Sequence, residues 1–152
     1  MVSSAIARTR KGLKTNLAKV YLFRWILHNQ SDASAIPMLR ALIPALKYGA
    51  RVLINDHVLS EPGKERAWDE KIMRTMDLVM LTLLNAQERT AGDFEELFRK
   101  ADERFVFKGV TRPKGCRMSI VEAIWNGEDA NGQNTLPPNV ERIPEIETPT
   151  WI

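Results

Sequence analysis

The chain has 152 residues, of which 44% are hydrophobic and 27% charged, and its formal net charge at pH 7 is +3. This length and composition are typical of one globular domain, and so small a net charge does not by itself indicate a nucleic-acid-binding protein. A single cysteine, Cys116, excludes an internal disulfide and favours a reducing compartment such as the cytoplasm, and no run of about 18 apolar residues predicts a membrane span.

The charges are unevenly distributed along the chain. Residues 1–24 contain only basic charges, whereas residues 127–152 contain mostly acids together with prolines and few aliphatic side chains. We interpret residues 1–17 as a separate basic segment and residues 127–152 as a disordered tail. A basic, serine-containing start without acids is also found in mitochondrial transit peptides, so that alternative stays open.

The first predicted strand covers residues 20–27 (VYLFRWIL), which are apolar on both faces apart from Arg24. Such a run suits a strand that is covered on both sides in a parallel sheet. His28 follows directly, and Ser31 is placed to cap a helix whose apolar residues recur at helical spacing up to residue 46. Pro44 should loosen the last turn of this helix, and Gly49 is placed to end it.

Residues 51–56 (RVLIND) predict a second strand, which completes a βαβ unit with two parallel neighbours. A long amphipathic helix is expected over residues 66–86, and a third helix begins at Thr90, with Asp93 three residues on as in a capping box. Two further strands, 104–111 and 117–125, are joined by the turn 112–115. The order of elements predicts an α/β fold, with a parallel pair followed by a C-terminal hairpin.

Four stretches in this order carry a family resemblance: YLFRWILHNQSD, LRALIPALKYGARVLINDHVL, MRTMDLVMLTLLNAQERTAGDFEELF and FVFKGVTRPKGCRMSIVEAIW. They resemble the C-terminal half of the S-adenosylmethionine-dependent O-methyltransferases of the plant caffeic-acid and fungal polyketide type, and especially the fungal enzymes of secondary metabolism. The resemblance covers residues 18–126. It implies a partial Rossmann-like methyltransferase sheet with helices on its faces.

The resemblance also implies roles for individual residues. His28 would be the general base that takes the proton of a substrate hydroxyl, with Asp56 and Glu88 flanking and orienting it. A neutral imidazole can accept a phenolic proton, and a carboxylate on its other nitrogen fixes the tautomer. We expect His28 and Asp56 to end neighbouring parallel strands at one edge of the sheet, where open α/β sheets build their sites.

The remaining site residues are likewise implied by the resemblance. The cofactor S-adenosylmethionine would be contacted by Arg24 and Trp25. An aromatic or polyketide acceptor would be bound by Met73, Met76, Asp77 and Met80, because methionine adapts to planar guests. Arg24 stands where the family often has lysine, and Gln30 where it usually has a tryptophan near the adenine.

The glycine-rich turn and the acidic ribose-binding residue of the family would precede residue 20, and the sequence does not contain them. We therefore expect a truncated enzyme that is inactive alone, with strand 20–27 at an exposed edge of its sheet. The alternative is a non-catalytic methyltransferase-like fragment, or an interaction module that self-associates through this strand.

The same residues have less specific interpretations. His28 would then be an ordinary strand-end histidine, and the methionine stripe would be core. His28 and His57 lack a third ligand, so we predict no metal site. Residues 8–19 could contact nucleic acid, but no aromatic residues are interleaved with the basic ones, so we expect neither a nucleic-acid nor a membrane partner.

Overall fold

The computed structural model describes residues 18–127. The predicted basic segment 1–17 and the predicted tail beyond residue 127 lie outside the described residues, as does most of the basic stretch 8–19. Among residues 18–127, no helix is both long and apolar enough to cross a membrane.

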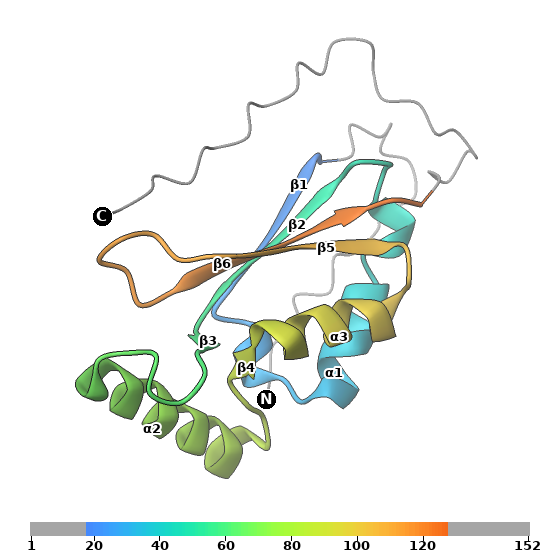
Figure 1. The fold of residues 1–152 in the computed structure, drawn as a ribbon. Coiled ribbons are helices and arrows are strands. Elements are labelled where there is room, and N and C mark those ends of the chain that lie inside the picture. Colours follow the sequence, from blue (N-terminus) through green and yellow to red (C-terminus); the bar gives the residue numbers. More distant parts are fainter. Residues whose placement is uncertain (1–17, 128–152) are drawn as a thin grey trace.

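One four-stranded sheet, in the order β1-β2-β6-β5, forms the centre of the structure (Figure 1). β1 and β2 are parallel, whereas β6 runs antiparallel to both β2 and β5. The bounds are Val20–Arg24 for β1, Arg51–Asp56 for β2, Phe105–Thr111 for β5 and Ser119–Trp125 for β6. This arrangement confirms the predicted α/β fold with its parallel pair and C-terminal hairpin.

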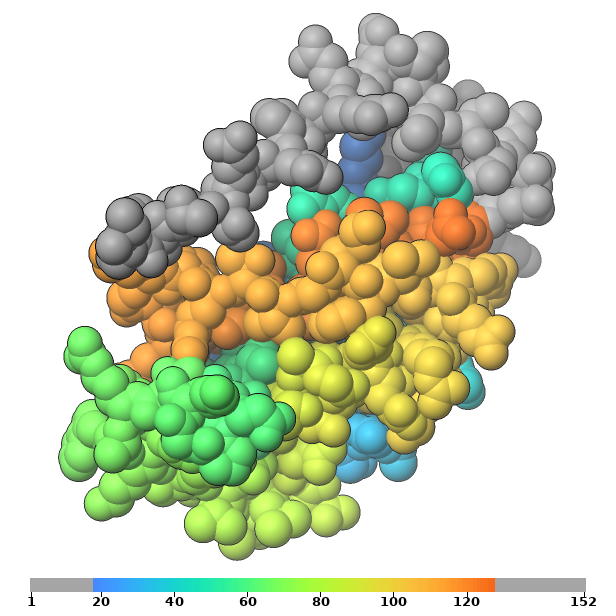
Figure 2. All heavy atoms as spheres, in the orientation of Figure 1, coloured from blue at the N-terminus to red at the C-terminus, as the bar shows by residue number. Residues whose placement is uncertain are grey.

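Within residues 18–127, three α-helices accompany the sheet: α1 Asp32–Arg40, α2 Ala67–Leu84 and α3 Ala91–Ala101. The same residues also form two short 3-10 helices, η1 Leu27–Asn29 and η2 Ile43–Ala45, and a separate pair of parallel two-residue strands, β3 Val58–Leu59 and β4 Arg89–Thr90. α1 and α3 pack together on one face of the sheet, whereas α2 lies beyond one end of it (Figure 1). Figure 2 shows the residues of α2 in green at the lower left of the molecule.

The first strand is shorter than predicted. β1 ends at Arg24, because Trp25 has a left-handed backbone with φ of 56° that breaks the extended conformation. The prediction that His28 directly follows a strand is therefore wrong, since His28 lies in η1. An apolar run of this length does not distinguish a strand from a strand followed by a tight turn.

The first helix also ends earlier than predicted. α1 stops at Arg40, and Pro44 lies in η2, where its missing N–H interrupts no α-helical bond. Ser31 stands at the N-cap position, but its side chain makes no capping hydrogen bond. Gly49 does adopt a left-handed φ of 75°, in the turn before β2 rather than at the helix end.

The start of α3 agrees with the sequence. Thr90 Oγ1 accepts a hydrogen bond from the backbone N–H of Asp93 at 3.2 Å, and the N–H of Thr90 donates to Oδ2 of Asp93 at 2.9 Å. This reciprocal capping box satisfies donors that the first helical turn leaves free. It fixes where α3 begins, immediately after β4.

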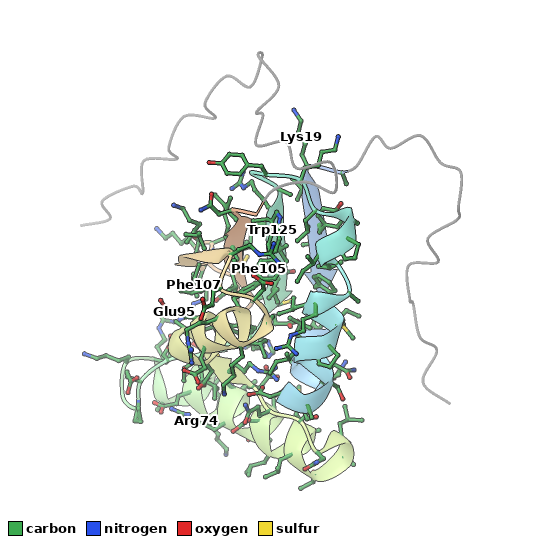
Figure 3. The ribbon with its side chains drawn as sticks, turned by 90° about the vertical axis from the view of Figure 1, so that its right-hand side faces the viewer. Lys19, Arg74, Glu95, Phe105, Phe107 and Trp125 are labelled. Carbon is green, nitrogen blue, oxygen red and sulfur yellow. The ribbon has the colours of Figure 1, made fainter. Side chains whose placement is uncertain are left out.

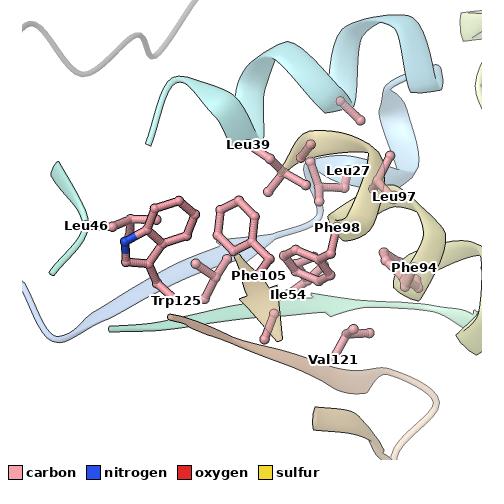
Figure 4. Close-up of a cluster of buried hydrophobic side chains, with 14 of the residues drawn as sticks. Leu27, Leu39, Leu46, Ile54, Phe94, Leu97, Phe98, Phe105, Val121 and Trp125 are labelled. Carbon is pink, nitrogen blue, oxygen red and sulfur yellow. The ribbon is translucent and has the colours of Figure 1, made fainter. Parts of the chain in front are cut away.

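The hydrophobic core fills the space between the sheet and the pair α1–α3 (Figure 4). Phe105 and Trp125, from the paired strands β5 and β6, lie side by side with ring centroids 4.8 Å apart (Figure 3). Phe98 of α3 contacts Phe105 at 5.5 Å and is fully buried. These contacts join the hairpin to the helical layer.

The opposite face of the sheet is not covered in the same way. Val20 and Leu22 of β1 are 46% and 63% exposed, so the prediction that this strand is buried on both faces is wrong for the described residues. Arg51 and Glu122 form an ion pair of 2.6 Å between β2 and β6 and are both partly exposed. Alternate residues of β1 therefore face the core and an open surface.

Candidate functional site

The carboxyl ends of β1 and β2 lie at the same edge of the sheet because the two strands are parallel. η1, which carries His28, follows β1 after two residues, and Asp56 is the last residue of β2. Glu88 reaches the same place from a distant part of the chain. Its neighbour Arg89 begins β4, and β4 pairs with β3 directly after β2. The fold thus brings the three predicted catalytic residues together.

The imidazole of His28 is held by Glu88. Nδ1 of His28 lies 3.1 Å from Oε1 of Glu88, and both side chains are buried. We expected Asp56 to contact the imidazole ring of His28. Instead, its Oδ2 accepts the backbone N–H of His28 at 3.2 Å. One carboxylate therefore orients the ring and the other orients the main chain.

This arrangement fixes which ring nitrogen can act as a base. An ionised carboxylate only accepts hydrogen bonds, so Nδ1 of His28 carries the hydrogen when it contacts Glu88. Nε2 is then the acceptor nitrogen. Nε2 is buried and has no hydrogen-bond partner among the described residues, so its lone pair is not used by the described part of the fold.

The pKa values of the two buried carboxyl groups, Glu88 and Asp56, are shifted in opposite directions. Burial raises the pKa of Glu88, but its contacts with His28 and His57 outweigh this and leave the pKa below its ordinary value. Burial raises the pKa of Asp56 above its ordinary value, although the nearby charge of His28 opposes the shift. Glu88 is thus suited to stay ionised beside an imidazole, whereas Asp56 retains a proton more readily.

His57 is a member of this cluster that the sequence analysis did not include in the catalytic site. Its Nδ1 lies 3.6 Å from the same Oε1 of Glu88, and its side chain is 7% exposed. The sequence feature that could have indicated its role is its position next to Asp56, at the end of a predicted strand. Within residues 18–127, no group of three or more side chains is arranged to hold a metal ion.

Trp25, predicted to contact the cofactor, lies over both histidines. Its ring makes edge contacts with His28 at 4.7 Å and with His57 at 5.1 Å between centroids, and it stays 38% exposed. The backbone φ of 56° turns this side chain toward η1. Arg24, the other predicted cofactor residue, is exposed at the last position of β1.

The four residues predicted to bind the acceptor all lie on α2, which contacts η1. Met73 and Met80 are buried, and Met76 and Asp77 are half-buried. Oδ1 of Asp77 accepts the backbone N–H of Glu88 at 2.8 Å, so this side chain also supports the cluster of His28 and Glu88.

Two of the surface hollows in the described part of the chain lie near α2 and near β3, and neither of these two is lined by His28. The smaller, of about 200 Å³, is lined by Met76 and other side chains of α2. The larger, of about 430 Å³, lies between β3, the start of α3 and Arg112, and includes none of the predicted site residues. Of the four predicted acceptor residues, Met76 alone lines either of these two hollows.

The sequence of this chain is similar to those of known proteins. Residues 14–103 match the family model of the O-methyltransferase domain. The chlorophenol O-methyltransferase of the fungus Trichoderma longibrachiatum is 58% identical over 109 residues, which are 72% of this chain and 23% of that protein.

Solved structures agree with this match. LaPhzM is similar with a TM-score of 0.61 at 36% identity, over 71% of this chain and 30% of that one. LepI, solved in complex with SAM, is similar with a TM-score of 0.61 at 25% identity, over 72% of this chain and 26% of that one. The chain spans less than a third of the length of each of these proteins. The likenesses confirm the resemblance found in the sequence.

Proposed function

Because the chain belongs to the O-methyltransferase domain family, we propose that its described residues supply the base for methyl transfer to a hydroxyl group, with His28 as that base. The observation that carries the proposal is the contact of 3.1 Å between Nδ1 of His28 and Oε1 of Glu88, which leaves Nε2 without a partner among residues 18–127. A histidine that only stabilised the fold would be expected to use both ring nitrogens when buried.

The residues of the cluster have separate tasks in this reaction. S-adenosylmethionine, when bound, supplies an electrophilic methyl group. Nε2 of His28 takes the proton of the acceptor hydroxyl, so that the oxygen becomes a stronger nucleophile. Glu88, held ionised by its two imidazole neighbours, stabilises the positive charge that His28 then carries. Asp56 keeps the main chain of His28 in place.

The described residues fit one side of a site for S-adenosylmethionine. Arg24 is exposed at the carboxyl end of β1, where its guanidinium group would pair with the cofactor's carboxylate. Trp25, partly exposed beside His28, offers an aromatic face to a cationic sulfonium. No G-x-G-x-x-G turn occurs among residues 18–127, so these residues form only part of the site and we propose that they are inactive alone.

The acceptor we propose is a phenolic hydroxyl on an aromatic or polyketide molecule. A phenol has a pKa near 10, so a neutral imidazole can remove its proton as the new bond forms. A chlorophenol is the acceptor named for the Trichoderma relative. Met76 lies in an apolar hollow on α2, where a flexible thioether suits a flat ring.

The test is binding and turnover with the full chain. S-adenosylmethionine is titrated calorimetrically into the chain alone, and into the chain mixed with a polypeptide that carries the glycine-rich half of a family member. We expect heat, and methylation of a chlorinated phenol, only in the mixture. No heat in either titration would contradict the proposal that this chain takes part in methyl transfer.

A second candidate function rests on a different observation. β1 is an edge strand, with Val20 and Leu22 exposed beside it, and exposed edges pair readily with other strands. We propose self-association through β1 as the alternative to catalysis. A monomer that binds S-adenosylmethionine would count against this alternative.

A further inference from the structure

The side chain of Arg89 is almost completely buried, at 1% exposure, and each of its three nitrogens donates a hydrogen bond. Nη1 donates to the carbonyl oxygen of Leu27 at 2.7 Å, and Nη2 to that of Gln30 at 2.8 Å. Nη2 and Nε also contact Oδ1 of Asp32, at 2.7 Å and 3.2 Å. A buried guanidinium group is costly unless it is paired and hydrogen-bonded, and here every nitrogen of the group makes a hydrogen bond.

The two carbonyl groups lie on either side of His28. Leu27 directly precedes it, and Gln30 follows two residues later, so Arg89 spans the whole of η1. Only a planar fork of donors reaches acceptors in these different directions at once, which is the geometry of arginine and not of lysine. The backbone that carries the imidazole is therefore held by one side chain from β4.

Arg89 is also the residue next to Glu88. The carboxylate of Glu88 holds the ring of His28, and the guanidinium of Arg89 holds the main chain around it. Both residues are anchored in turn, because Arg89 pairs with Val58 in the β3–β4 ladder and the N–H of Glu88 donates to Asp77. Two adjacent residues thus contact the ring of His28 and the main chain around it, in addition to Asp56, which accepts the N–H of His28.

We infer that Arg89 is a positioning residue for His28, which maintains the contact between Nδ1 and Glu88 and so keeps Nε2 as the acceptor nitrogen. The inference rests on the proposed role of His28 as a base. A purely stabilising arginine is available for comparison. Arg40 donates to the carbonyl oxygens of Ala101 at 2.8 Å and Lys100 at 2.7 Å, and so joins α1 to α3 away from η1.

The experiment measures the tautomer of His28 in the full chain by NMR, with ¹⁵N in the imidazole rings. The chain has only two histidines, so the spectrum of His57→Gln assigns the signals of His28. We expect Arg89→Lys to reduce the ratio of Nδ1–H to Nε2–H tautomer about tenfold, since about one hydrogen bond's contribution to that preference is lost. Arg40→Lys should leave the ratio unchanged, although it too removes hydrogen bonds from a guanidinium group to backbone carbonyl oxygens.

Two outcomes overturn the inference: an unchanged tautomer ratio in Arg89→Lys, or an equal change in Arg40→Lys. If Arg89→Lys does not fold, Asp32→Asn provides the test, because the side chain of Asp32 is 42% exposed and only one acceptor is weakened. That variant should change the ratio in the same direction but less, and no change would again overturn the inference. The measurement needs neither cofactor nor acceptor, so its failure is separate from a failure of methyl transfer.

Discussion

The imidazole of His28 and the carboxylate of Glu88 are in contact at 3.1 Å although 60 residues separate them in the chain. The contact depends on two parallel pairings, β1 with β2 and β3 with β4, which bring η1 and residue 88 to one edge of the structure. Both side chains are buried there. An ion pair that forms on protonation is strengthened in such a place, where water screens it little.

Replacement of the base gives the first prediction. In the mixture that supports methyl transfer, His28→Gln should lower the turnover rate by about 10²–10⁴-fold, because a positioned general base contributes that much. Glu88→Gln should cause a smaller loss, since the base remains but its tautomer is no longer fixed. The exposed Glu96→Gln serves as the control and should retain full activity. Full activity of His28→Gln would show that another group takes the proton.

The two carboxyl groups of the cluster should give folding stability opposite dependences on pH. The pKa of Glu88 is lowered in the fold from 4.5, so its stabilising contribution is complete above that value and is lost as the pH falls through the lowered pKa. The pKa of Asp56 is raised from 3.8, so its contribution is complete below that value and is lost as the pH rises through the raised pKa.

Urea unfolding of two isosteric variants tests this pair of signs. With rising pH, the free energy of unfolding of Glu88→Gln should fall relative to that of the native chain, and that of Asp56→Asn should rise relative to it. At the acid end both differences should be smallest, because the native carboxyl groups are then protonated as well. If both differences in the free energy of unfolding changed in the same direction with rising pH, the assigned pKa shifts would be contradicted.

The core can be tested with two tryptophans that differ in burial. Trp125 is 1% exposed and packs on Phe105, whereas Trp68 on α2 is 66% exposed. Trp125→Ala should lower the free energy of unfolding by about 3–5 kcal/mol, because it removes a large buried ring and leaves a cavity. Trp68→Ala should change it by no more than about 0.5 kcal/mol. If urea denaturation showed similar losses of unfolding free energy for Trp125→Ala and Trp68→Ala, α2 would be packed more firmly than the exposure of Trp68 indicates.

The proposed self-association through β1 gives a further prediction. Leu22→Lys places a charge in the middle of the exposed strand and should lower the apparent mass in light scattering toward that of a monomer. Ile26→Lys is the matched control, because Ile26 is 40% exposed but lies beyond the end of β1. Equal effects of both substitutions would indicate general solubilisation, and no effect of either would argue against association through this edge.

The sequence predicted those parts of the fold that depend on local patterns. β2 begins and ends at the predicted residues, and the capping box at Thr90 and Asp93 forms as expected, because alternation and cap chemistry act over a few residues. The end of β1 could not be predicted in this way. It depends on the left-handed backbone of Trp25, a conformation that a non-glycine residue adopts only when its surroundings require it.

The residues of the candidate site were predicted from the family resemblance, but their contacts with one another were not. The resemblance assigned Asp56 and Glu88 to His28, but only coordinates separate a carboxylate on the ring from one on the main chain. Arg89 gave no local signal, because a charged residue is normally expected at the surface. Its burial follows from acceptors in η1 and α1, which are distant in the sequence.

The position of α2 outside the main hydrophobic core has a consequence for how often the contact between His28 and Glu88 is supported. None of its side chains joins the main core, and of its residues only Met73 and Met80 are buried. We therefore expect its amide protons to exchange with solvent faster than those of β2 and β6, through opening of this helix without global unfolding. Each such opening would break the hydrogen bond from the N–H of Glu88 to Asp77. The fraction of time in which Glu88 is held beside the imidazole of His28 would then depend on how long α2 stays packed.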